Sequence, residues 1–239
     1  MVPVEFILGF IAMVTSAIAG FIGFGGGMLL IAVLPSFLSP SLIIPIHGVT
    51  QLASNSSRMF FSLAHVKWSL LPKFLAGSLI GMLVFGFFLS KLSFEYVPVA
   101  IGSYILLNLW SKRFAHFIRR YESYYLIGFL QTGLGLIVGA VGPLSLAVLT
   151  KQLKSNDAVI ATSSMFLTIS HLAKIPVYAA VTSDLVSNLN VIVYMVVGSI
   201  LGSFIGTKAR FSAGNKKVIL IIKTLLTLLA IRMLLAVFL

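Results

Sequence analysis

Long apolar runs follow one another along almost the whole chain, and short groups of glycine, proline and charged residues separate them. Most runs reach or approach the roughly 20 residues that a helix needs to cross the hydrocarbon core of a bilayer. With the separating groups taken as breaks, the pattern predicts ten helical pieces. These pieces cover residues 3–22, 27–38, 41–64, 68–90, 94–111, 122–138, 143–151, 157–181, 185–209 and 216–238. The chain is therefore expected to be an all-α integral membrane protein.

Two of the ten pieces, 27–38 and 143–151, are too short to cross a hydrocarbon core of about 30 Å. Each follows a glycine-rich stretch, GFGGG at residues 23–27 and GAVGP at residues 139–143. Backbone that leaves the helix inside a membrane must be satisfied by protein or by water in a cavity. We therefore expect two helix breaks at membrane depth, which face each other or a substrate path.

The charges of the loops help to decide how often the chain crosses the membrane at the two broken pieces. If each short piece continued the span before it, the chain would make eight crossings, and its basic loops would lie on both sides of the membrane. If residues 3–38 and 122–151 instead each enter and return to the same face, six net crossings remain and the basic loops all face the cytoplasm. We favour this second arrangement, with both termini, Asp184 and the Lys91/Glu95 loop outside, while kinked single spans stay an alternative. The basic residues placed on the cytoplasmic side are Lys67, Lys73, Lys112, Arg113, Arg119, Arg120, Lys151, Lys154, Lys208, Arg210, Lys216 and Lys217.

The second arrangement predicts two inverted repeats, because each half then has a re-entrant hairpin plus three spanning helices, an odd number of crossings. A shift of 116 residues superimposes the glycine breaks and the polar runs of the two halves. It pairs Gly23 with Gly139, Gly26 with Gly142, Ser54 with Ser170, Asn55 with His171 and Arg58 with Lys174. A second echo, between residues 77–81 and 198–202, has a shift of 121, which an insertion in a loop explains. We expect a first membrane repeat over 1–111, a basic cytoplasmic linker over 112–121 and a second membrane repeat over 122–239.

Composition narrows the function classes. Of the 239 residues 59% are hydrophobic and 9% are charged, which leaves no room for a soluble catalytic domain beside the helices. The net charge of +12 is interpreted as topology-setting loop charge rather than as a nucleic-acid surface. The chain has no cysteine, so disulfides and Cys-ligated metal are excluded, and we expect neither a metal nor another cofactor. All five acidic residues lie at predicted segment ends, which argues against cation binding or a carboxylate proton relay.

The candidate chemistry is anion binding. Each glycine break precedes a helix N-terminus, where free N–H groups and the positive end of the helix dipole favour an anion. The third piece concentrates polar residues, and its helical spacing puts four of them on one face: Gln51, Ser54, Asn55 and Arg58. His47, on the same piece, is compatible with a structural role. The predicted substrate-binding residues are Gly23, Gly25, Gly26, Gly27, Gln51, Ser54, Asn55, Arg58, Gly139, Gly142, Ser170, His171 and Lys174.

Other readings stay open at this point. An anion channel has the same sequence requirements as a carrier. A membrane-embedded enzyme would need a nucleophile and a base, for which Ser145 and His171 are the available residues, but no nucleophile-elbow sequence surrounds Ser145. A scaffold without transport activity would not require the polar density of the third piece. No nucleotide-binding motif is present, so transport is expected to be secondary or to use a separate ATPase.

Four motifs carry a family resemblance: GFIGFGGG at residues 20–27, SNSS at 54–57, HVKW at 65–68 and the small-residue string at 77–81. With these the chain resembles the TauE/SafE family of sulfite exporters and related anion permeases along nearly its whole length. The resemblance implies transport of sulfite, sulfonates or other small anions across a prokaryotic cytoplasmic membrane. It implies a small anion and the lipid bilayer as partners, and leaves a homo-oligomer open.

Overall fold

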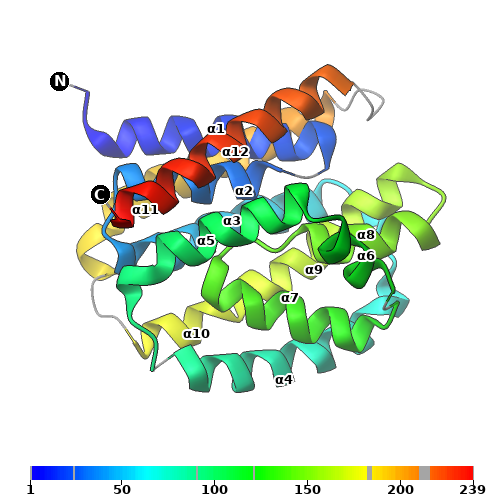
Figure 1. Ribbon diagram of the computed structural model, residues 1–239. Helices are drawn as coiled ribbons and strands as arrows, with labels where there is room; N and C mark the ends of the chain where they lie inside the picture. Colours follow the sequence, from blue (N-terminus) through cyan, green and yellow to red (C-terminus); the bar gives the residue numbers. More distant parts are fainter. Residues whose placement is uncertain are drawn as a thin grey trace.

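The computed structural model describes residues 2–23, 25–89, 91–120, 122–181, 185–209 and 216–238, and within these ranges it contains helices and no strand (Figure 1). The α-helices of the first half are α1 (Val4–Ile22), α2 (Gly26–Val33), α3 (Pro40–Phe60), α4 (Leu71–Leu89) and α5 (Val97–Trp110). After α6 (Lys112–Arg120), the second half has α7 (Tyr124–Val138), α8 (Pro143–Gln152), α9 (Asn156–Leu172), α10 (Lys174–Ala179), α11 (Leu189–Lys208) and α12 (Lys216–Phe238). Short 3-10 turns occupy Leu34–Ser36, Leu63–His65, Trp68–Leu70, Phe94–Tyr96 and Val186–Asn188.

Each of the ten predicted pieces corresponds to helix in the structure, with two differences. The piece predicted at 157–181 is one helical span, Asn156–Ala179, in which an irregular turn at Ala173 separates α9 from α10. Pro176 explains the division, because proline has no N–H to donate to the carbonyl of Leu172. The predicted linker 112–121 contains a helix, α6. The hydroxyl of Ser111 accepts the N–H of Phe114 at 3.1 Å and so caps the first turn of this helix.

Among the described residues, five helices are long and apolar enough to cross a membrane by length and composition. They are Val4–Ile22, Trp68–Leu89, Asn156–Ala179, Leu189–Lys208 and Ile219–Ala236. Large apolar side chains such as Leu83 and Phe87 of α4 point outward, as the lipid-facing surface of a membrane protein requires. Helix α3 is also long, but its polar residues lower its hydropathy, and they are buried inside the bundle. Asp184 and Arg210, which were assigned to opposite sides of the membrane, lie outside the described residues.

Two closely packed helix pairs each join one half of the chain to the other. Figure 1 shows α1 beside α11 at one side of the bundle and α4 with α7 at the opposite side. In the second pair, a side chain at Gly77 or Gly81 would collide with the backbone carbonyls of Tyr125 and Phe129. The glycines therefore let the backbones of α4 and α7 touch, which is how small residues promote helix packing in membranes.

The pair α1 and α11 packs in the corresponding way. A side chain at Gly198 or Gly202 would collide with the backbone carbonyls of Gly9 and Met13. Gly9 and Met13 lie 116 residues before the carbonyls that α4 meets, and the two glycines lie 121 residues after those of α4. The same contacts thus occur twice, with the roles of the two halves exchanged.

The centre of the molecule lies between these two pairs. Helices α3 and α9 pack against each other there, and the short helices α2 and α8 lie against them. The main apolar cluster surrounds α2 and includes Leu30, Ile31 and Ile43. Polar side chains of α3 and α9 are buried beside this cluster, so the fold collects the candidate residues at its centre.

Candidate functional site

The two helix breaks have the backbone geometry for which glycine is required. Gly23 ends α1 with φ 91°, Gly25 precedes α2 with φ 88°, and Gly139 ends α7 with φ 75°. Only glycine enters this left-handed region without steric cost. The N–H of Gly23 still donates to the carbonyl of Ala19 at 2.9 Å, which closes the last turn of α1.

The breaks of the two halves lie next to each other. A side chain at Gly139 would collide with Ile31 of α2, and its Cβ would lie 3.7 Å from Nδ1 of His47. Gly26 is equally confined, because its Cβ would be 2.8 Å from that of Ala19. The interior at this point is built from backbone of both halves.

A small cavity, called here the central cavity, lies between the breaks and helices α3 and α9. Its volume is about 40 Å³, which is room for a small ion or a few water molecules. Of the predicted residues, those that line it are Gly23, Gly25, Gly27, Gln51, Asn55, Arg58, Gly142 and His171. The other predicted residues, Gly26, Ser54, Gly139, Ser170 and Lys174, lie around it without lining it. Polar lining residues outside the prediction are His47 and Ser163.

The amide of Asn55 is used within α3. Its Nδ2 donates to the backbone carbonyl of Gln51 at 2.6 Å and to Oε1 of the same residue at 3.3 Å, and its Oδ1 accepts from Nη2 of Arg58 at 3.2 Å. Among the described residues, the buried Nε2 of Gln51 has no hydrogen-bond partner. An amide donor is costly to leave unpaired in an interior. Gln51 is therefore the side chain with an N–H to offer to a ligand, and Asn55 positions it.

Two buried basic side chains donate hydrogen bonds to backbone carbonyls at the C-terminal ends of α1 and α7. Arg58, 2% exposed, donates from Nη1 to the carbonyl of Ala19 at 3.4 Å, in the last turn of α1. Lys174, 1% exposed, donates from Nζ to the carbonyl of Gly139, just past the end of α7. A positive charge at a helix C-terminus offsets the partial negative charge of the free carbonyls there. Among the described residues no carboxylate lines the central cavity, and the charged side chain in its wall is the guanidinium of Arg58.

The serines of the predicted set make bonds between helices. The hydroxyl of Ser54 in α3 lies 3.0 Å from that of Ser203 in α11. The hydroxyl of Ser170 in α9 accepts from Nε2 of Gln131 at 3.3 Å and lies 3.1 Å from that of Thr132, both in α7. Buried hydroxyls commonly connect helices in this way in membranes. These two positions hold the walls of the central cavity together.

The N-termini of the two short helices differ. Gly25 is the N-cap residue of α2, and no side-chain hydrogen bond caps this helix. No capping side chain therefore competes with a ligand there. In α8 the first residue, Pro143, has no N–H, and the N–H of Ser145 donates to Oε1 of Gln131 at 3.1 Å. Free N–H groups at a helix start are what an anion binds. The α2 terminus therefore has more donors to offer.

Two histidines, one from each half, share the wall of the central cavity. His47 of α3 and His171 of α9 have ring centroids 5.5 Å apart in an edge-to-face arrangement. The sequence analysis left His47 as compatible with a structural role and did not include it among the predicted substrate-binding residues. The shift of 116 residues pairs His47 with Ser163, and both line the cavity. This pairing in the sequence could have identified both as candidate site residues.

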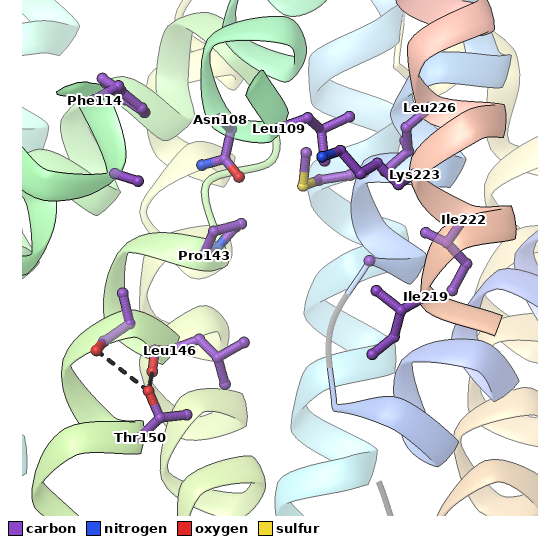
Figure 2. A pocket seen from close by; sticks show the side chains of 14 residues that line it. Asn108, Leu109, Phe114, Pro143, Leu146, Thr150, Ile219, Ile222, Lys223 and Leu226 are labelled. Atoms are coloured by element: carbon purple, nitrogen blue, oxygen red, sulfur yellow. Dashed lines mark hydrogen bonds between the residues drawn. The ribbon is translucent and has the colours of Figure 1, made fainter. Parts of the chain in front are cut away.

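A larger cavity of about 300 Å³, the outer cavity, adjoins the central one (Figure 2). Gly25, Met28 and Pro143 line both cavities, so these residues form the partition between them. Figure 2 shows the outer cavity between α5 and α8 on one side and α2 and α12 on the other, with the side chains of Asn108 and Lys223 in it.

Two polar side chains in the wall of the outer cavity, Thr150 and Lys223, differ in the contacts they already make within the protein. The hydroxyl of Thr150 donates to the carbonyl of Leu146 at 2.9 Å, within α8. Nζ of Lys223 lies 3.7 Å from the ring centroid of Trp110, a cation–π contact that leaves its hydrogens able to donate. Lys223 is the charged residue in the wall of this cavity.

An ion pair joins the ends of α7 and α8. Nζ of Lys151 donates to the carboxylate of Glu122 at 3.0 Å, and Nε2 of Gln152 donates to the same carboxylate at 3.4 Å. These hydrogen bonds hold the pKa of Glu122 below its ordinary value. The pair therefore stays ionised at neutral pH and connects the residues before α7 with the last turn of α8.

Comparison with known proteins agrees with this description. The family model described as Sulfite exporter TauE/SafE matches residues 8–233, nearly the whole chain. No curated protein and no solved structure matches the chain. The family match includes both breaks, both cavities and the helices that form them.

Proposed function

Since the chain belongs to the TauE/SafE sulfite exporter family, a family of membrane transporters, we propose that it moves a small sulfur-containing oxyanion, such as sulfite or a sulfonate, by alternating access. The oxyanion binds in the central cavity in this proposal. Transport is secondary, because the chain has no nucleotide-binding motif. An inside-negative potential favours outward movement of an anion by about 2.3 kcal/mol per charge per 100 mV, so export needs no further energy source.

The observation that carries the proposal is the donor set of the central cavity. Gln51 offers an amide N–H, Arg58 a guanidinium charge, and the start of α2 its backbone N–H groups. Hydrogen bonds from charged donors to an oxyanion are about twice as strong as those between neutral groups. A cation would meet no carboxylate among the described residues of this cavity. The site thus fits a small anion with several oxygen acceptors.

The proposed motion follows from the repeated contacts of the two halves. We take the halves as inverted repeats, each with a re-entrant hairpin, α1–α2 in the first and α7–α8 in the second. Support comes from the matching glycine contacts of α4 with α7 and of α11 with α1. Two related halves around one site can rock against each other and expose it to either side. In this scheme the partition formed by Gly25, Met28 and Pro143 opens toward the outer cavity.

The test is uptake of radiolabelled sulfite into proteoliposomes at fixed pH and set membrane potential. Wild type is compared with Gln51→Ala and Asn55→Ala, and with Ser56→Ala as the matched control. The Ser56 hydroxyl donates to the carbonyls of Leu52 and Ala53 within α3 and does not line the central cavity, so its loss is expected to leave the cavity unchanged. Gly26→Leu is unsuitable as a site variant, because the larger side chain would collide with α1 and disturb folding.

We expect saturable uptake by wild type and Ser56→Ala, and much slower uptake by the two cavity variants. Wild type that is inert to sulfite would next be assayed with methanesulfonate, thiosulfate, sulfate and small carboxylates. Inertness to all of them would contradict the proposal. Unitary current steps in planar bilayers would show a channel instead of a carrier.

A further inference from the structure

The two histidines of the central cavity are the ionisable groups that the anion site leaves unexplained. His47 is 0% exposed and His171 is 3% exposed. The Nδ1 atom of each ring is buried and has no hydrogen-bond partner among the described residues. Both rings line the cavity in which the anion is placed, so whatever occupies the cavity also meets these nitrogens.

The protonation pattern of His47 follows from its partner. Its Nε2 lies 2.9 Å from the backbone carbonyl of Gly27, which can only accept a hydrogen bond. Nε2 therefore carries the proton, and in the neutral ring Nδ1 has a free lone pair. A Cβ on Gly139 would lie 3.7 Å from this Nδ1. One imidazole thus connects the start of α2 in the first half with the break of the second half.

In the part of the chain that the structure describes, the other ionisable side chains facing the pair are basic. Arg58 faces it from α3 and Lys174 from α10, in addition to the second histidine from α9. Helices α1, α2, α7 and α8 add no ionisable side chain to the wall of the cavity. A proton that entered the empty cavity would be repelled by these cations. An anion in the cavity reverses the balance, because it attracts the proton at short range.

Proton and anion therefore promote each other's binding, and thermodynamic linkage makes the effect reciprocal. We propose that His47 and His171 form a proton-binding site, so that the protein carries a proton together with each anion. The proton enters the Nδ1 lone pair from the side on which the anion binds and leaves with the anion on the other side. No other bond changes. This inference rests on the proposed function and changes its energetics. One proton with each monovalent anion moves no net charge, so the membrane potential no longer drives export and the net direction follows the sum of the proton and anion gradients.

The test uses methanesulfonate, and thiosulfate as a second probe, because both stay ionised near neutral pH and cross bilayers poorly as acids. Proteoliposomes contain equal anion inside and outside, with the membrane potential clamped at zero. The outside is then made about one pH unit more acidic. One proton per anion predicts about tenfold accumulation inside, since a proton gradient of one unit is a tenfold ratio.

Variants assign the coupling to the pair. His47→Gln and His171→Gln, with the Asn versions as replacements for any that does not fold, are tested by the final distribution of the anion and not by its rate. Whatever uptake each variant retains is expected to end at equal anion concentrations inside and outside, without accumulation under the pH gradient. His116→Gln is the matched control, because this exposed histidine of α6 is outside the central cavity, and it is expected to accumulate anion as wild type does.

Three results overturn the inference. Wild type that carries the anion but does not accumulate it would leave the proposed function intact and remove proton coupling. Accumulation by both histidine variants equal to that of wild type would place the proton elsewhere. Wild type that carries neither methanesulfonate nor thiosulfate would contradict sulfonate and thiosulfate transport itself, and the coupling with it.

Discussion

At the scale of single residues, the interior of this protein is organised by what each polar side chain has to satisfy. The buried cations Arg58 and Lys174 bind backbone carbonyls that the broken helices leave free. Asn55 is occupied on both sides of its amide, by Gln51 and by Arg58. The amide of Gln51 in the cavity wall has a buried N–H donor with no hydrogen-bond partner among the described residues. Anion binding at this residue is the prediction that belongs to this scale.

Gln51→Glu replaces the amide by a carboxylate of nearly the same shape. The new group cannot donate and carries a negative charge, so it repels an anion while it can still accept from Asn55. Loss of one hydrogen bond to a charged ligand is worth about 1.5–3 kcal/mol, so we expect uptake at low anion concentration to fall about tenfold to a hundredfold. Asn156→Asp, the same change at the exposed start of α9, is the control. Unchanged uptake by Gln51→Glu would show that the anion binds elsewhere.

At the scale of the elements, glycines decide where helices touch. Three of them stand at breaks with positive φ, and others stand where two helix backbones meet. Helix α4 has one glycine in a close contact with another helix backbone and one with more space around it. Gly81 faces the carbonyl of Phe129 in α7, whereas a Cβ on Gly86 would be 3.5 Å from Val177, an ordinary contact. The two positions allow one substitution to be compared in two settings.

Gly81→Ala is expected to lower the melting temperature of the protein in detergent, because the methyl group forces α4 away from α7. Overpacking of this kind typically costs about 1–3 kcal/mol. Gly86→Ala, the control in the same helix, is expected to be neutral or stabilising by up to about 1 kcal/mol, since alanine favours helix over glycine. Thermal unfolding followed by size-exclusion chromatography measures both. Equal melting temperatures for the two variants would mean that the contact of α4 with α7 yields without cost.

At the scale of the whole molecule, two ends of the bundle are distinguished. The chain begins and ends at one end, and α6 lies at the other, near α8 (Figure 1). The outer cavity borders on α6 and α8 and is separated from the central cavity by three residues. If the basic end faces the cytoplasm, as the distribution of lysine and arginine predicts, the outer cavity is the cytoplasmic approach to the anion site.

The orientation can be measured directly, because the chain has no cysteine of its own. Lys154→Cys marks the loop between α8 and α9, and Glu95→Cys marks the turn before α5, at exposed positions of the two ends. We expect a membrane-impermeant maleimide to label Glu95→Cys on intact cells and to reach Lys154→Cys only after lysis. Labelling of Lys154→Cys from outside would contradict the orientation.

The outer cavity can be filled by a substitution that leaves the residues of the central cavity unchanged. Ala147 lies in the wall of the outer cavity, and Ala147→Trp would fill much of that space. We expect anion uptake to fall at least about tenfold while the protein elutes and melts like wild type. Leu79→Trp, on the exposed outer face of α4, is the matched control and is expected to transport normally. Full activity of Ala147→Trp would exclude the outer cavity from the route.

The helices and their breaks could be predicted from the sequence, because the length of an apolar run and the need for glycine at positive φ are local properties of the chain. The family and the membrane location could be predicted for the same reason, since their motifs are contiguous. The division of the ninth and tenth helices at Ala173 was missed, although Pro176 marks it.

What only the tertiary structure decided is which polar residues reach the central cavity. The hydroxyls of Ser54 and Ser170 form hydrogen bonds with other helices. The amino group of Lys174 donates to the backbone carbonyl of Gly139, 35 residues earlier in the chain. His47, which no local feature singles out, stands on the cavity wall beside His171, 124 residues away. The direction of a side chain between packed helices depends on partners far away in the chain, so the sequence alone names the candidates and the packing selects among them.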